Sequence, residues 1–251
     1  MSRTGPRVKM TAAKLGATDH RDEAAQTAMD RVIETRRSVR RFIDRPVSKQ
    51  LLIDILTLAA RAPSNSNIQP WRIVLAAGAV KDALARAISD AHRVAPDEHQ
   101  PERPIFAPDM PQSYVERRRR FGQLFFGTLG IHAADTAARS RQSARNFVFF
   151  DAPVVAFFTV DRRLEVGSWF DCGLFAQTFM LAARARGIDT CAQIALSKYH
   201  AIVRRHLSID DTQIVVCGMS IGYADALARE NTVRMPRVPV DAFATLIGFA
   251  L

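Results

Sequence analysis

The segment SWFDCGLFAQTFMLAARARG, residues 168–187, has the length of a helix of about five turns and is apolar on nearly all of its sides. A helix on the surface of a monomer keeps a polar face toward water, and this segment has none. It therefore lies at the centre of a core or packs against another subunit. Gly187 follows the last turn and is the residue type expected just beyond a helix C-terminus.

Apolar periodicity predicts strands and helices around this segment. Ser48 is expected to cap one of the helices at its N-terminus, and Pro63 to stop it. Strands are predicted over 71–77, 152–160 and 213–224, and helices over 24–36, 49–62, 79–92, 113–141 and 197–207. Because no internal repeat and no linker interrupts the pattern, we expect a flexible tail over residues 1–24 and one domain over 25–251.

The net charge of +10 leaves three classes of partner open: nucleic acid, an anionic membrane surface, and small acidic ligands. No apolar run approaches the roughly 20 residues that span a bilayer, so no membrane partner is expected. Cys172, Cys191 and Cys217 are far apart and odd in number, which indicates buried free thiols in a reducing, cytoplasmic compartment. The basic N-terminus lacks the apolar core of a secretory signal, so we expect a tail there, with a transit peptide as the alternative.

Five prolines between residues 94 and 114 exclude regular structure there and predict a long surface excursion, a candidate lid. Tyr114, at its end, either lies over a pocket as a substrate contact or is an exposed aromatic. The arginines of residues 117–120 either hold a nucleotide phosphate or a substrate carboxylate, or form a solvated helix face.

The stretch RRSVRRF, residues 36–42, concentrates positive charge beside a hydroxyl. In extended backbone, alternate side chains point to the same side, so Arg36, Ser38 and Arg40 are predicted to face one way and Arg37 and Arg41 the other. Two guanidiniums beside a hydroxyl suit a phosphate dianion. A solvated charged turn is the alternative.

The stretch APSNSNIQPW, residues 62–71, holds Ser, Asn and Gln side chains between two prolines. Such a loop presents both donors and acceptors to a flat heterocycle with a mixed edge. The alternative is a turn whose polar side chains bond only to the turn itself.

Together these two stretches resemble the FMN-dependent nitroreductase family, whose N-terminal signature is RRS.R.F followed about twenty-five residues later by APS..N.QPW. The segments NFVFFDAPVVAFF, FDCGLFAQTFMLAARARGIDTC, IGYA and MPRVPVDAF continue the resemblance, which covers residues 28–251. The resemblance implies an α+β fold with a central, mostly antiparallel sheet flanked by helices. It also implies an intertwined homodimer with FMN at the subunit interface, which agrees with the apolar helix.

Four places in the chain match the family's FMN contacts. Arg36 and Ser38 match the phosphate end, and Arg40 matches the ribityl chain or pyrimidine edge. Met235 departs from the family pattern, which often has a basic residue two positions before the late arginine, so that Arg234 is the candidate substitute. The full set is Arg36, Arg37, Ser38 and Arg40; Pro63, Ser64, Asn65 and Asn67 against the ring; the backbone amides of Gln193, Ile194 and Ala195; and Arg234 and Arg237 at the phosphate, with loop charges as the alternative for the last two.

The family's chemistry is the reduction of nitroaromatic compounds to nitroso and hydroxylamino products with NADPH or NADH. The chain lacks the GxGxxG signature of a nicotinamide domain, so donor and acceptor are predicted to use one pocket in turn, by a ping-pong mechanism. No catalytic side chain is assigned, because the flavin carries the reactivity, and histidine spacing indicates no metal. The alternatives are quinones, enones or oxygen as acceptor, and a basic nucleic-acid-binding protein. Scattered arginines disfavour nucleic acid as a partner.

Overall fold

A computed structural model describes residues 20–249 of the chain, and the side chains of residues 23–249. Contacts divide the chain into two units between Thr35 and Arg36. Helix α1 (His20–Thr35) belongs to the first unit. Most of the predicted tail, residues 1–24, lies outside the described residues, and residues 20–24 open α1. That α1 shares one domain with the rest of the chain stays a prediction.

The second unit is built on a five-stranded sheet whose paired strands all run antiparallel. The strand order is β1-β5-β3-β2, with β4 paired to β5. The strands are β1 (Phe42–Ile43), β2 (Arg72–Ala77), β3 (Val154–Asp161), β4 (Asp189–Gln193) and β5 (Gln213–Ala224). The three predicted strands are confirmed, and β5 has the predicted bounds.

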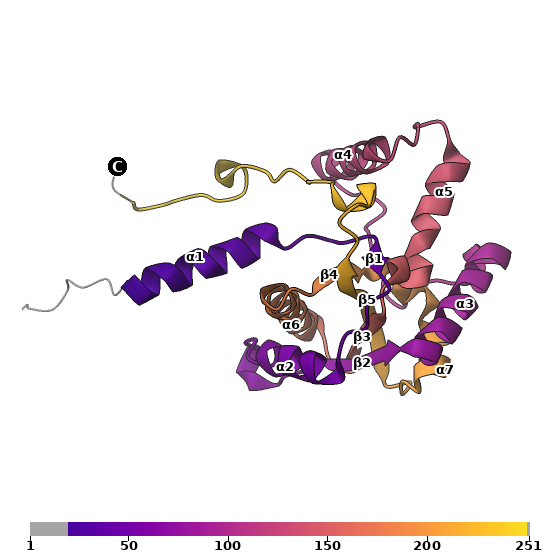
Figure 1. Cartoon of the computed structure of the whole chain (residues 1–251), viewed down its shortest axis with the longest axis horizontal. Coiled ribbons are helices and arrows are strands. Elements are labelled where there is room, and N and C mark those ends of the chain that lie inside the picture. The colour runs from indigo at the N-terminus through magenta and orange to yellow at the C-terminus, as the bar shows by residue number, and fades with distance from the viewer. Residues whose placement is uncertain (1–19, 250–251) are drawn as a thin grey trace, which may run out of the picture. The chain divides into compact units, whose positions relative to one another are not determined.

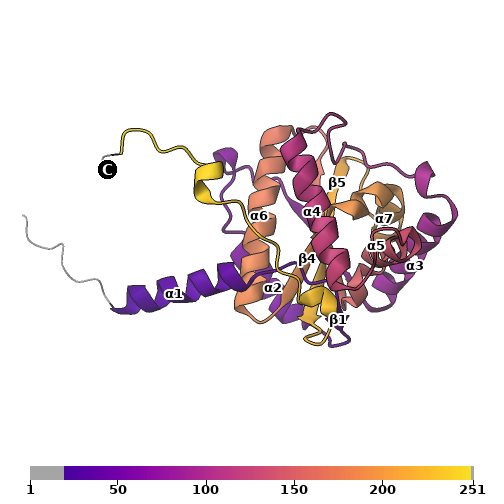
Figure 2. The ribbon, with the colours of Figure 1, turned by 90° about the horizontal axis from the view of Figure 1, so that it is seen from above.

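Helices cover both faces of this sheet, as Figure 1 shows. Helices α2 and α6 pack on one face, and α3 and α7 on the other (Figures 1 and 2). The helices are α2 (Lys49–Ala59), α3 (Gly78–Val94), α4 (Gln112–Thr128), α5 (Thr136–Ala144), α6 (Val166–Ala185) and α7 (His200–Leu207). The α+β class, with a mostly antiparallel sheet flanked by helices, is confirmed.

Strand β3 separates two cores because its side chains alternate between the faces of the sheet. Ala156 and Phe158 join the cluster beneath α2 and α6, whereas Val155 and Phe157 join the cluster beneath α3 and α7. All four are fully buried. On β5, a Cβ added to Gly218 would come within 2.4 Å of Leu196 Cδ1, so a larger residue there would force the buried Leu196 side chain to shift.

The boundaries of the helices follow their capping residues. Ser48 accepts the N–H of Leu51 at 3.2 Å and caps α2, as predicted. Gly187 has a φ of +73° and ends α6, also as predicted. The prediction of one helix over 113–141 is wrong, because Gly130 has a φ of +72° and donates to Gly127 O at 2.9 Å. This left-handed turn ends α4, and Asp135 caps the separate helix α5.

The apolar helix α6 is only partly covered by its own chain. Phe175 and Phe179 are buried against the sheet. At the N-terminal end of the helix, Val166 is 81% exposed and Phe170 is 68% exposed. The side of α6 that carries these two residues is therefore mostly uncovered by the described part of the chain.

Candidate functional site

Residues 36–42 run in extended conformation beside β4. Ser38 forms a parallel bridge with Thr190, and the Val39 N–H donates to Thr190 O at 3.1 Å. Val39 is fully buried against Cys191. This pairing holds the backbone of the segment against β4.

That the side chains of residues 36–41 alternate between two sides stays a prediction. Arg36, Ser38 and Arg40 all act on the thiol of Cys191, although burial is the larger effect and raises its pKa to about 11. Arg41 forms an ion pair with Asp151 at 2.8 Å. Arg36, Ser38 and Arg40 thus all lie near the Cys191 thiol.

Arginines from the two ends of this unit approach one another. Burial lowers the pKa of Arg36, and the charge of Arg237 lowers it further. Burial also lowers the pKa of Arg37, and the charge of Arg234 lowers it further. Arginine stays protonated at neutral pH, so these directions record desolvation and repulsion between cations. Arg36 with Arg237, and Arg37 with Arg234, thus form two pairs of neighbouring cations, and an anion beside either pair would relieve both costs.

Asn231 connects two segments that are far apart in the sequence, its own and that of Arg40 and Arg41. Its Oδ1 accepts the Arg40 N–H at 2.8 Å, and its Nδ2 donates to Arg41 O at 2.7 Å. The side chain is 3% exposed, so the amide is fully used within the protein. Asn231 thus links the segment that carries Arg234 to the backbone of residues 36–41, called here the arginine cluster.

Residues 63–69 form a loop with unusual backbone geometry. Ser66, Asn67 and Gln69 have φ values of 48°, 57° and 50°, in the left-handed region that costs a non-glycine residue roughly 1–3 kcal/mol. The Gln69 N–H donates to Ser64 Oγ at 3.0 Å. The Asn65 backbone N–H donates to Asp171 on α6. The side-chain hydrogen bonds of residues 64–69 within the described residues stay inside the loop, so the flavin-facing role of this loop stays a prediction. The side chains of Asn65 and Asn67 remain exposed.

A pocket of about 690 Å³ lies beside this loop. It is lined by Pro63, Ser64 and Asn65 from the loop and by the first turns of α6, including Phe170 and Asp171. None of the predicted arginines lines it. The loop of residues 63–69 and the arginines of residues 36–41 therefore do not share this pocket.

The third predicted segment follows β4. The Gln193 side chain is 3% exposed and donates to Asn146 O at 2.9 Å, which fixes the turn from β4 into a 3₁₀ helix, η4 (Ile194–Tyr199). The first N–H groups of a helix have no acceptor within it, so Ile194 and Ala195 begin a segment with backbone donors to offer. The bridge between Ser38 and Thr190 places β4 next to the arginine cluster.

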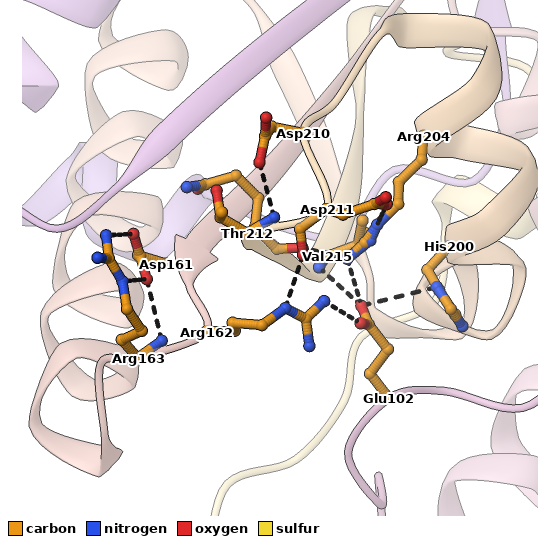
Figure 3. Close-up of polar contacts among 11 residues, drawn as sticks. Glu102, Asp161, Arg162, Arg163, His200, Arg204, Asp210, Asp211, Thr212 and Val215 are labelled. Carbon is orange, nitrogen blue, oxygen red and sulfur yellow. Dashed lines mark hydrogen bonds and ion pairs between the residues drawn. The ribbon is translucent and has the colours of Figure 1, made fainter.

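The predicted excursion is an anchored segment. It runs from the end of α3 to Pro111, with one short 3₁₀ turn, η2 (Pro96–Glu98). Figure 3 shows the Glu102 carboxylate between Arg162 and Arg204, at 2.9 and 2.8 Å, with His200 Nδ1 at 3.7 Å. That the segment covers a pocket stays a prediction.

Tyr114 belongs to the first turn of α4. Its side chain is 51% exposed, and the Arg117 guanidinium lies 5.0 Å from its ring centre. Arg118 lies in the same way 4.0 Å from the ring centre of Phe106. The substrate contact predicted for Tyr114 stays a prediction.

Comparison with known proteins identifies the family. Residues 33–223 match the model of the nitroreductase family. The chain belongs to the nitroreductase family. It is 43% identical to 4-nitrobenzoate reductase of Pseudomonas putida over 223 residues, which are 88% of this chain and 96% of the relative. It is 41% identical to nitrobenzene nitroreductase of Ectopseudomonas oleovorans over 219 residues, 87% of this chain and 96% of that protein.

The crystal structure of the FMN-dependent nitroreductase NfnB from Mycobacterium smegmatis in complex with NADPH superimposes with a TM-score of 0.84 at 34% identity. The match covers 88% of this chain and 99% of that chain. The family, the fold class and the enzyme class predicted from the sequence are thereby confirmed.

The residues of this nitroreductase-family chain fit an anionic cofactor tail. Arg36 and Arg37 form no ion pair with any carboxylate of the described residues, and Arg37 Nε is buried with no hydrogen-bond partner there. A phosphate group would supply the missing acceptor and counter-charge. No group of three or more His, Cys, Asp or Glu side chains in the described residues could hold a metal ion. No helix in that part of the chain is long and apolar enough to cross a membrane.

Sequence reasoning missed Asp171 and Asn231. Each residue forms a hydrogen bond with a segment far away in the chain, and no local sequence motif indicates either contact. Asp171 is the only acidic residue in the otherwise apolar run at residues 166–183, and this isolation is the one signal that could have drawn attention to it.

Proposed function

We propose that this protein is an FMN-dependent oxidoreductase that uses NADPH or NADH to reduce nitroaromatic compounds to nitroso and hydroxylamino products. The observation that carries the proposal is the approach of Arg36 to Arg237 and of Arg37 to Arg234. Relatives named for nitrobenzoate and nitrobenzene reduction, and a neighbour bound to NADPH, support the choice of acceptor and donor.

In this proposal the arginine cluster binds the phosphate end of FMN. Arg36 and Arg237 neutralise the phosphate charge, and the Ser38 hydroxyl adds a neutral hydrogen bond. The backbone donors at the start of η4 and the exposed amides of Asn65 and Asn67 orient the ring. FMN, when bound, supplies the transfer of hydride and electrons.

We infer that the active form is a homodimer. In the described part of the chain, no arginine of residues 36–41 lines the pocket beside the loop of residues 63–69, which supports a site built from two copies. Large apolar residues after Arg237 also support it, because the segment runs away from the sheet in Figures 1 and 2. The most exposed large apolar residues of this segment are Val240 (65%), Phe243 (68%), Leu246 (74%), Ile247 (84%) and Phe249 (74%).

Donor and acceptor are proposed to occupy the same space over the ring, one after the other. The described strands pair antiparallel, which supports the absence of a doubly wound, parallel nicotinamide domain. Steady-state rates with nitroaromatics, quinones, enones and oxygen as acceptors would decide among the possible substrates. Parallel lines in double-reciprocal plots are expected for the ping-pong order.

A cytoplasmic location is proposed from the thiols. Cys172, Cys191 and Cys217 are free, and burial raises the pKa of Cys172 to about 11. No nucleic-acid partner is proposed, because several arginines are already engaged, such as Arg118 over the ring of Phe106.

The test is direct. Purified protein should be yellow, should release FMN on denaturation, and should oxidise NADPH or NADH over many turnovers when a nitroaromatic acceptor such as 4-nitrobenzoate is present. Forced monomers should lose FMN. Folded, colourless protein that takes up no FMN in a titration would overturn the proposal.

A further inference from the structure

The side chain of Asp171 is a buried acid with one described donor. It lies on α6, is 2% exposed, and its Oδ1 and Oδ2 are both 3.2 Å from the Asn65 nitrogen. Among the described residues, no other group donates a hydrogen bond to it. A carboxylate in such a place is costly unless it is bound to a partner, so packing alone does not account for it.

The hydrogen bond from Asn65 to Asp171 is also what connects the loop of residues 64–69 to α6. Within residues 64–69 the other hydrogen bonds stay inside the loop, as from Gln69 N to Ser64 Oγ and from Ile68 N to Asn65 O. In the described part of the chain, the bond to Asp171 is the only hydrogen bond from these residues to another segment. The loop holds three residues in the left-handed region, a conformation that surrounding structure must impose.

We propose that Asp171 is a positioning residue for the flavin. By fixing the Asn65 peptide, it holds the loop in the conformation that presents Asn65 and Asn67 to the ring. The inference rests on the proposed function, since the loop is a proposed flavin contact. It also makes α6 the part of the fold that sets the position of the loop, because the same helix carries the rest of the pocket wall.

Asp171→Ala and Asp171→Asn test the carboxylate. The alanine variant should raise the Kd of the apoprotein for FMN about tenfold or more and alter the visible absorption bands of the bound flavin. The asparagine variant keeps an acceptor oxygen for the Asn65 N–H, so it should stay within about threefold of wild type. Cys172→Ala is the matched control, because Cys172 is adjacent on α6, equally buried, and packs in the core instead of against the loop. It should lower the Tm of the apoprotein and leave FMN affinity and spectrum unchanged.

Asn65→Pro tests the same bond from the other side. Asn65 is the first residue of the 3₁₀ turn η1 (Asn65–Asn67), a position that suits proline, and Ser64 before it is extended, with a φ of −145°. Proline removes the N–H donor, whereas Asn65→Ala keeps it and loses only the side chain. A Kd for Asn65→Pro about tenfold above that of Asn65→Ala is expected, and this comparison serves if Asp171→Ala does not fold.

The outcomes separate the two hypotheses. Wild-type protein that binds no FMN overturns the proposed function and this inference with it. Wild-type protein that binds FMN, beside an Asp171→Ala variant with the same Kd and the same spectrum, overturns the inference alone. Equal losses of affinity in Asp171→Ala and Cys172→Ala would also overturn it, since they would show general destabilisation of α6.

Discussion

The guanidinium of Arg40 lies 5.1 Å from the centre of the Phe125 ring. A second ring of α4, Phe121, lies 5.4 Å from the same guanidinium. Cation–π contacts of this kind contribute about 0.5–2 kcal/mol. Arg40 therefore joins the arginine cluster to α4, the helix that follows the anchored excursion.

The two phenylalanines allow this link to be tested with a built-in comparison. Phe125 is 5% exposed and Phe121 is 39% exposed. Phe125→Leu should lower the free energy of unfolding by about 1–3 kcal/mol, because it loses both burial and the cation–π contact. Phe121→Leu should cost about 1 kcal/mol or less. Urea denaturation of the apoprotein measures both, and equal losses would show that burial beneath Arg40 is not what distinguishes the rings.

Repulsion between Arg237 and the arginine cluster predicts opposite effects on stability and binding. Arg237→Gln removes a charge that disfavours Arg36, so the apoprotein should keep or raise its Tm. The same change should weaken FMN binding by about tenfold or more, since a charged hydrogen bond to phosphate is lost. Differential scanning calorimetry and FMN titration report the two quantities.

The control for this prediction is Arg61→Gln, an exposed arginine at the end of α2 that forms no ion pair with the described residues. It should move neither quantity. Inorganic phosphate should raise the Tm of the wild-type apoprotein more than that of Arg237→Gln. An apoprotein that loses stability on Arg237→Gln would contradict the view of the cluster as an unsatisfied anion site.

Much of the sheet could be predicted from the sequence because its strands are long and apolar. Local chemistry also sufficed at Ser48 and Gly187, where a single side chain or its absence ends a helix.

The contacts that organise the site were not predictable in this way. Asp171 meets Asn65 across 106 positions, and Asn231 meets Arg40 across 191. No local pattern specifies such pairs, since they depend on how α6 and the sheet pack. Gly130 was missed for the opposite reason: a glycine within an otherwise helical pattern ends a helix only if the next turn finds other contacts.

Glu102 offers a test of the anchored excursion. Its side chain is 14% exposed and pairs with Arg204, which is itself 9% exposed. Glu102→Gln should lower the free energy of unfolding by about 2–3 kcal/mol, because it leaves a buried guanidinium without its charged partner. Glu98→Gln, an exposed change in the same segment, should cost less than about 0.5 kcal/mol. Equal urea midpoints for the two variants would show that the excursion is not held by this carboxylate.

Stability should fall in mild acid because of His92. Its Nδ1 lies 2.8 Å from the Tyr199 hydroxyl, and burial lowers its pKa, with Lys198 lowering it further. The unfolded chain, whose histidine titrates near 6.5, therefore takes up a proton as pH falls below about 6.5, while the folded protein does not. This opposes folding by at most about 1.4 kcal/mol per pH unit until the lower folded pKa is reached. His200, whose pKa burial also lowers, acts in the same direction. His92→Gln should flatten the fall in urea midpoint between pH 7 and pH 5.5, and an unchanged slope would assign the acid sensitivity to other groups.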